Sequence, residues 1–162
     1  MMFEDVLRID NSSLEAKKNF NDMYVTLDQK IKKNKARKQP FDEKIILRFL
    51  NENLTHLLKF HKTFLHSGKM TPQNFIYLED EKCVIFQPLN TVDSNYDETN
   101  FTAPETRDGL PSIHSDIYSL GCIVLYMCTG TLPKSAELYN KKIPNLPKPY
   151  SDDLNFLLTS ML

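Results

Sequence analysis

The sequence contains no tryptophan, only four glycines and only three cysteines among its 162 residues. The glycines are too widely spaced to form the Gly-x-Gly-x-x-Gly loop that cradles nucleotide phosphates. The cysteines are odd in number and lack metal-ligand spacing, which argues against a zinc site and a disulfide framework. We therefore expect buried thiols in a reducing, intracellular compartment. These residues are Gly68, Gly109, Gly121 and Gly130, and Cys83, Cys122 and Cys128.

Neither sign of charge predominates, because 20 Lys and Arg residues stand against 21 Asp and Glu residues. This balance gives no general reason to expect binding to nucleic acid or to a membrane surface. No apolar run approaches the roughly 20 residues that a membrane-spanning helix needs. Residues 1–10 carry acids and no apolar run, unlike a secretory signal. The expected location is the cytoplasm.

The most apolar stretch is residues 120–128, which carries no charge and has one hydroxyl, on a tyrosine. A helix that is apolar on every face belongs in the middle of a domain. Ser115 or Asp116 is expected to cap its start, and Gly130, followed closely by Pro133, is expected to end it. The rest of the chain should wrap around this helix.

Two amphipathic helices and several short strands are predicted around it. Apolar residues recur at three- and four-residue spacing after Asp42, which predicts a long helix from there to about Phe64. A second amphipathic helix is predicted over residues 151–162. Strands are expected at residues 3–10 and 22–27 and in the region just before Gln87. The predicted stripe of the long helix consists of Ile45, Ile46, Phe49, Leu50, Leu54, Leu57, Leu58 and Phe64.

A basic run between residues 30 and 38 contains six Lys and Arg residues in nine positions. Such a run invites the reading of a nucleic-acid interface or a docking site for an acidic partner. The plainer alternative is a solvated helix face, which we favour because no aromatic platform for stacked bases accompanies the run. Nucleic acid is therefore not an expected partner.

Three motifs follow one another in the second half of the chain: Ala-Pro-Glu at 103–105, Asp-Ile-Tyr-Ser-Leu-Gly at 116–121 and Thr-Gly-Thr-Leu-Pro at 129–133. In this order and spacing they resemble the large lobe of a eukaryotic protein kinase. The lysine-rich run at residues 30–38 adds a weaker similarity to NIMA-related kinases. The resemblance implies a mainly α fold with a buried central helix and one or two short β-hairpins. Residues 1–27 would be a remnant of small-lobe strands, and residues 28–162 a large lobe truncated at its C-terminal end.

The resemblance fails where the family carries its chemistry. Aligned without a gap, Ser67, Gly68 and Lys69 replace the family's His-Arg-Asp, whose Asp handles the proton of the substrate hydroxyl. An ammonium group already holds its proton at neutral pH, so Lys69 cannot serve as the base. Thr71 replaces the Lys that contacts the transferring phosphate. Gln87, or Phe86 in a register one residue earlier, replaces the magnesium-binding Asp.

The expected function is therefore a catalytically inactive, pseudokinase-like module that binds protein, without cofactor or metal. The alternative is a serine/threonine kinase fragment that retains ATP-dependent activity or nucleotide binding. The retained motif residues are Pro72, Asn74, Ala103, Pro104, Glu105, Asp116 and Gly121. In the family an Arg beyond the last helix pairs with the Glu, so Glu105 is expected to lack that partner. Tyr96 and Thr99 are candidate phosphorylation sites.

Association with a protein partner or with a second copy is also expected. In a complete kinase a small lobe and terminal helices would cover two surfaces of this lobe, so apolar residues there should be exposed. Large exposed apolar patches usually mark association sites. The residues expected to be exposed are Leu65, Met70, Phe75, Ile76, Leu157, Met161 and Leu162.

Overall fold

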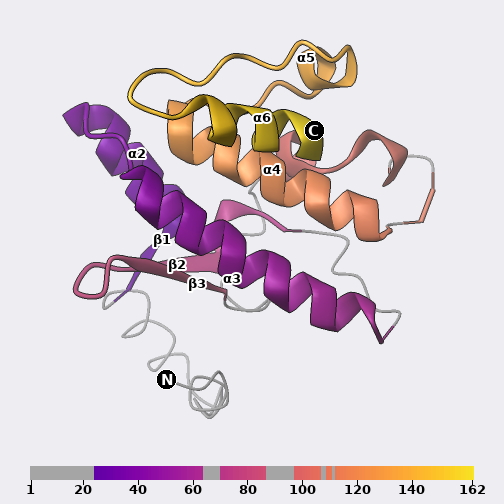
Figure 1. Cartoon of the computed structure of the whole chain (residues 1–162), viewed down its shortest axis with the longest axis horizontal. Helices are drawn as coiled ribbons and strands as arrows, with labels where there is room; N and C mark the ends of the chain where they lie inside the picture. The colour runs from indigo at the N-terminus through magenta and orange to yellow at the C-terminus, as the bar shows by residue number, and fades with distance from the viewer. Residues whose placement is uncertain (1–23, 64–69, 87–96, 107–108, 111) are drawn as a thin grey trace.

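A computed structural model describes residues 24–63, 70–86, 97–106, 109–110 and 112–162. The described part is mainly helical, with helices packed around one central helix and a small sheet beside them (Figure 1). The helices are α2 (Leu27–Arg37), α3 (Glu43–His61), α4 (Ile113–Thr129), α5 (Ser135–Tyr139) and α6 (Asp152–Met161), with 3-10 turns η2 (Pro72–Asn74), η3 (Glu98–Phe101) and η4 (Pro104–Thr106).

The sheet has three antiparallel strands in the order β1 (Val25–Thr26), β2 (Phe75–Leu78) and β3 (Cys83–Phe86). Strands β2 and β3 form a hairpin, which agrees with the strand expected before Gln87. The strand expected at residues 22–27 is present as the short β1, whereas the one expected at residues 3–10 lies outside the described residues. The proposed division of the chain after residue 27 stays a prediction.

Helix α4 is the central helix that the sequence predicts, and every residue from Tyr118 to Cys128 is buried. Its C-terminal end is also confirmed, because Gly130 adopts a left-handed conformation with φ of 64° and donates its N–H to Tyr126 O at 2.8 Å. This conformation disfavours residues with a side chain. The predicted start was wrong: Ser112 caps the helix, not Ser115 or Asp116, since Ser112 and Ser115 form a capping box.

Helices α3 and α6 pack against α4 (Figure 1). Asp42 caps α3 as predicted, with its carboxylate accepting from Lys44 N–H at 2.9 Å. Ser151 caps α6 and is itself bound by Glu43, whose carboxylate accepts from the Ser151 hydroxyl at 2.6 Å and from its N–H at 2.8 Å. These two hydrogen bonds join the N-terminal end of α3 to that of α6.

Helix α3 buries a narrower stripe than the sequence suggested. Its buried apolar residues include Phe49, Leu50 and Leu57, whereas Leu58 is 60% exposed. One residue corresponds to about 100° around a helix, so Leu58 lies on the side of α3 opposite Phe49 and outside the buried arc between Phe49 and Leu50. Leu157 of α6 is likewise exposed, although its neighbour Leu158 is buried. Phe64 lies outside the described residues.

The expectation of an exposed apolar patch near the sheet was wrong. Met70, Phe75 and Ile76 are all buried. The ring of Phe75 packs edge-on against Phe49 of α3 at 5.1 Å and against Phe86 of β3 at 5.3 Å between centroids. These three side chains therefore do not need a partner protein to bury them.

At the other end of the fold the expectation of exposure was only partly right. Leu157 is exposed, as expected, and Met161 is partly buried. Leu162 is buried, because it packs against Gly121 of α4. Leu65, the remaining residue of the predicted patch, lies outside the described residues. None of the described helices is both long enough and apolar enough to cross a bilayer.

Candidate functional site

The turn between residues 71 and 74 is where the kinase resemblance places a phosphate-contacting Lys and a metal-binding Asn. Thr71 and Asn74 are both buried there, and Pro72 opens the short η2 turn between them. Asn74 Oδ1 accepts a hydrogen bond from Thr71 N–H at 2.8 Å and lies 3.2 Å from the Thr71 hydroxyl. Thr71 Oγ1 in turn accepts from Gln73 N–H at 3.2 Å. The polar groups of this turn are thus bonded to one another.

This geometry limits what the turn can do chemically. A hard cation such as magnesium needs several oxygen ligands that point to one place. Here the side-chain oxygen of Asn74 is directed at Thr71, where it closes a reciprocal cap. Among the described residues, no group of three or more His, Cys, Asp or Glu side chains is placed to hold a metal ion. The turn has the arrangement of a structural cap.

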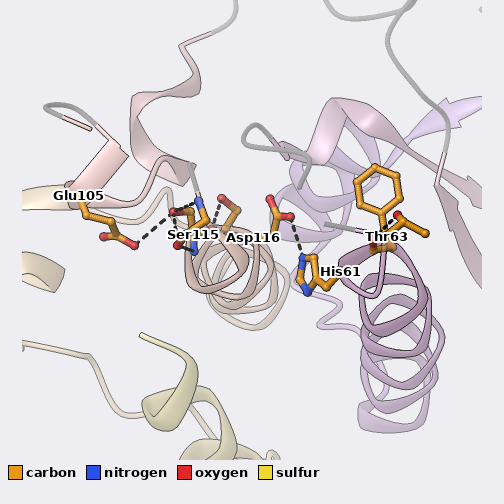
Figure 2. Close-up of polar contacts among 8 residues, drawn as sticks. His61, Thr63, Glu105, Ser115 and Asp116 are labelled. Carbon is orange, nitrogen blue, oxygen red and sulfur yellow. Dashed lines mark hydrogen bonds and ion pairs between the residues drawn. The ribbon is translucent and has the colours of Figure 1, made fainter. Parts of the chain in front are cut away.

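A buried pair joins the end of α3 to the first turn of α4. His61 Nε2 lies 3.0 Å from Asp116 Oδ2, and the two side chains are only 9% and 1% exposed (Figure 2). Nε2 donates to the carboxylate when it carries the imidazole hydrogen. The sequence marked Asp116 as a motif residue, but it did not predict the contact with His61.

Glu105 has a partner that the sequence reasoning missed. The hydroxyl of Ser115 donates to Glu105 Oε1 at 3.3 Å, which connects η4 to the first turn of α4 (Figure 2). The same hydroxyl oxygen accepts from Ser112 N–H at 3.1 Å. In place of the Arg that the resemblance implies, a nearby neutral hydroxyl group donates a hydrogen bond to the Glu105 carboxylate.

The other retained motif residues have packing roles. Ala103 is buried in the core, and Pro104 begins η4. Gly121 allows α6 to approach α4, because a Cβ there would lie 3.0 Å from Leu162 Cδ2 and 3.1 Å from Met161 Cβ. Such contacts are closer than carbon atoms normally come.

Several predicted site residues cannot be placed next to these. Ser67, Gly68, Lys69, Gln87 and Tyr96 lie outside the described residues. The residues brought together by the structure are thus Thr71 with Asn74, His61 with Asp116, and Glu105 with Ser115.

Residues 30–37 of the basic run lie in α2, and two of its lysines form ion pairs within the chain. Lys30 pairs with Glu79 and lies 4.4 Å from the ring centroid of Tyr77. Lys32 pairs with Asp28 at 2.7 Å. The pKa of Glu79 is lowered, chiefly by its hydrogen bond from Lys30. The contacts of Lys30 hold α2 against the sheet. That nucleic acid is not a partner stays a prediction.

The thiols of α4 are unsuited to nucleophilic chemistry. Burial raises the pKa of Cys122 to about 12 and that of Cys128 to about 12. The reactive form of cysteine is the thiolate, which is scarce at neutral pH when the pKa is this high. Cys83 is also buried, and desolvation raises the pKa of its thiol. All of the cysteines thus fit the expectation of buried core residues.

Comparison with curated proteins finds a serine/threonine-protein kinase of Caenorhabditis elegans that is 29% identical over 146 aligned residues. The match covers 79% of this chain but 15% of the relative's length. No family model matches the sequence. The similarity points to a distant kinase-like relation, in agreement with the motif order at residues 103–133.

Proposed function

We propose that this chain is a catalytically inactive, protein-kinase-like large lobe that acts as a protein-interaction or regulatory module. The observation that carries the proposal is the closed turn at Thr71 and Asn74. An Asn oxygen that accepts hydrogen bonds from its own turn is poorly placed to bind a metal ion as well. A kinase without bound magnesium loses the group that bridges and neutralises the phosphates.

Residue identities outside the described part add to the proposal. Lys69 stands where the family has a carboxylate base, and Gln87 where it has a magnesium ligand. Transition-state stabilisation in phosphoryl transfer is shared among base, metal ions and phosphate clamps. Loss of all three kinds of group would remove catalysis, so no single substitution should restore it.

The competing function is an ATP-dependent serine/threonine kinase fragment. The specific observation in its favour is the similarity to the Caenorhabditis elegans serine/threonine-protein kinase. The chain spans about 15% of that relative's length, so the activity named there can reside in a part that this chain does not match. Nucleotide binding is the property on which the two functions differ.

Calorimetric titration with ATP and magnesium distinguishes them. We expect no binding in the micromolar range, and none for the Lys69→Asp variant, because the other groups remain absent. A radiolabelled phosphate assay on both proteins should give no turnover above a control without enzyme. A micromolar magnesium-dependent site, or turnover in either protein, would establish the competing function and refute inactivity.

The interaction part of the proposal concerns the exposed face of α6. Phe156 is 76% exposed and Leu157 is 37% exposed, although the rest of that helix buries its apolar residues or presents polar ones. Exposed apolar groups favour burial by about 25 cal/mol per Å² before the costs of association are subtracted. We expect light scattering at micromolar concentration to show self-association, or co-purification from cells to show a stable partner.

A matched pair of variants locates the surface. Phe156→Ser should weaken the association, whereas Leu47→Ser, at a 45% exposed position of α3, should leave it unchanged. A well-behaved monomer that co-purifies with nothing would contradict the proposed role as an interaction module.

A further inference from the structure

The segment from Asp97 to Thr106, which includes η3 and η4, is attached to the core through its middle. Phe101 is 1% exposed, and its ring centroid lies 6.1 Å from that of Tyr126 on α4. Ala103 is also 1% exposed. Burying an aromatic side chain of this size is worth several kcal/mol of stability against truncation to alanine. The middle of the segment is therefore held by hydrophobic burial.

Hydroxyl groups from two other elements hold the flanks of the segment. Ser135, the first residue of α5, donates to Thr99 O at 3.1 Å. Ser115 of α4 donates to Glu105 Oε1 at 3.3 Å. Both donors are neutral and belong to the chain itself. The segment is thus held by one hydrogen bond on each side of Phe101. Neither bond depends on a phosphate group or on a cationic side chain that would bind one.

Thr99 is exposed, and its surroundings oppose an added phosphate. Asp97 Oδ1 accepts from the Thr99 hydroxyl at 2.6 Å and from its N–H at 3.0 Å. These two bonds lower the pKa of Asp97, so the carboxylate is ionised at neutral pH. Phosphorylation would remove the hydroxyl donor and place about −1.5 to −2 charges beside that carboxylate. Like-charge repulsion would open the Asp97 cap.

We infer that residues 97–106 are held in one conformation without phosphorylation, with Ser115 as the positioning residue for Glu105, and that a phosphate at Thr99 releases this segment. The anchoring stands on the contacts above, whatever the chain binds. Its use as regulation of a protein-binding module rests on the proposed function.

Hydrogen exchange on phosphatase-treated protein tests the anchoring. The reporters are Thr102 N–H, which donates to Thr99 O, and Thr106 N–H, which donates to Ala103 O. We expect both to exchange at least about tenfold more slowly than an unstructured peptide. Thr99→Glu should accelerate exchange at Thr102. Exchange at peptide rates in the unmodified protein, or slower exchange in Thr99→Glu, would overturn the inference.

Ser115→Ala tests the positioning role. We expect exchange at Thr106 to accelerate by about threefold or more, while the amides of α6 stay unchanged. Ser119→Ala is the matched control, because that hydroxyl, one turn further along α4, donates to Ser115 O within the helix. If Ser115→Ala does not fold, Glu105→Ala removes the same bond from its exposed end. Equal acceleration throughout the chain, or none at Thr106, would refute the role of Ser115.

The two proposals fail in distinguishable ways. Loss of the exchange protection would refute the anchoring whatever the chain binds. A monomer that binds no protein would refute the interaction module even if residues 97–106 remain protected.

Discussion

The first turn of α4 and the turn at residues 71–74 both carry polar residues of the kinase motifs, but they use them differently. In α4, Ser115 and Asp116 reach outward to Glu105 and His61, which belong to other elements. In the other turn, Thr71 and Asn74 bond to each other. The first turn of α4 therefore forms hydrogen bonds to other elements, whereas the side chains of Thr71 and Asn74 bond within their own turn.

The largest expected effect is a loss of folding stability at high pH, which tests how completely the side chains of α4 are buried. The ordinary thiol pKa is 9.0, and burial raises that of Cys122 and of Cys128 to about 12. Between these values the unfolded chain releases protons that the folded chain retains. Stability should hold up to about pH 9 and then fall by about 1.4 kcal/mol per pH unit for each thiol. Burial also raises the pKa of Tyr126 and Tyr150, which adds to the loss above pH 10.

Urea unfolding followed by circular dichroism between pH 8 and pH 11 would measure this loss. Cys122→Ala should reduce the slope between pH 9 and pH 10, where the tyrosines contribute least. A midpoint that does not change with pH over this range would show that α4 is less sealed than its burial indicates.

Removal of Asp116 tests the outward bonds of α4. Asp116→Ala leaves the ring of His61 without this acceptor in a buried site, and we expect a loss of about 3 kcal/mol. The matched control is His114→Ala, an exposed position on the same helix, which should change stability by less than about 0.5 kcal/mol. Chemical denaturation measures both. Similar losses of stability in the two variants would show that the contact between Asp116 and His61 contributes no more than an exposed side chain does.

The close approach of α6 to α4 should be sensitive to a single methyl group. Gly121→Ala places a Cβ 3.0 Å from Leu162 Cδ2, and overpacking of this kind costs about 2 kcal/mol. Leu162→Ala removes the nearest of the atoms that clash, so the double variant should lose less stability than the sum of the single losses. Thermal unfolding of all three variants gives the coupling; purely additive losses would argue against direct contact.

The smallest effect belongs to the closed turn. Thr71→Ala removes the hydroxyl that accepts from Gln73 N–H, and loss of a cap of this kind costs about 1 kcal/mol. Thr159→Ala, where an exposed hydroxyl bonds only its own helix, is the control and should cost less. Isothermal titration should detect no gain in magnesium affinity in either variant. Magnesium binding by Thr71→Ala would mean that the hydroxyl alone keeps Asn74 from acting as a ligand.

The sequence predicted helix positions and ends correctly where a single residue or a single run of residues determines them. The uncharged run at residues 120–128 required burial, Gly130 ended α4, and Asp42 capped α3. The start of α4 was missed because three candidate caps, Ser112, Ser115 and Asp116, stand within five positions. Only their final hydrogen bonds distinguish them, and these depend on the path by which the preceding segment enters the helix.

Exposure was harder to predict than helix position. The sequence reasoning treated Met70, Phe75 and Ile76 as surface residues, because it inferred cover from the parts that a complete kinase would have. The structure buries all three, and Phe75 packs against Phe49 of α3. Burial depends on every element packed nearby, so a pattern within one element cannot determine it.

The sequence by itself determined which chemical groups this protein has. Residue 69 is a lysine and residue 87 a neutral glutamine, where the kinase resemblance expects two carboxylates. Only the tertiary structure decided which polar groups meet, such as His61 with Asp116, 55 residues apart, and Ser115 with Glu105. Hydrogen bonds act over about 3 Å, and that proximity is set by how the helices pack rather than by distance along the chain.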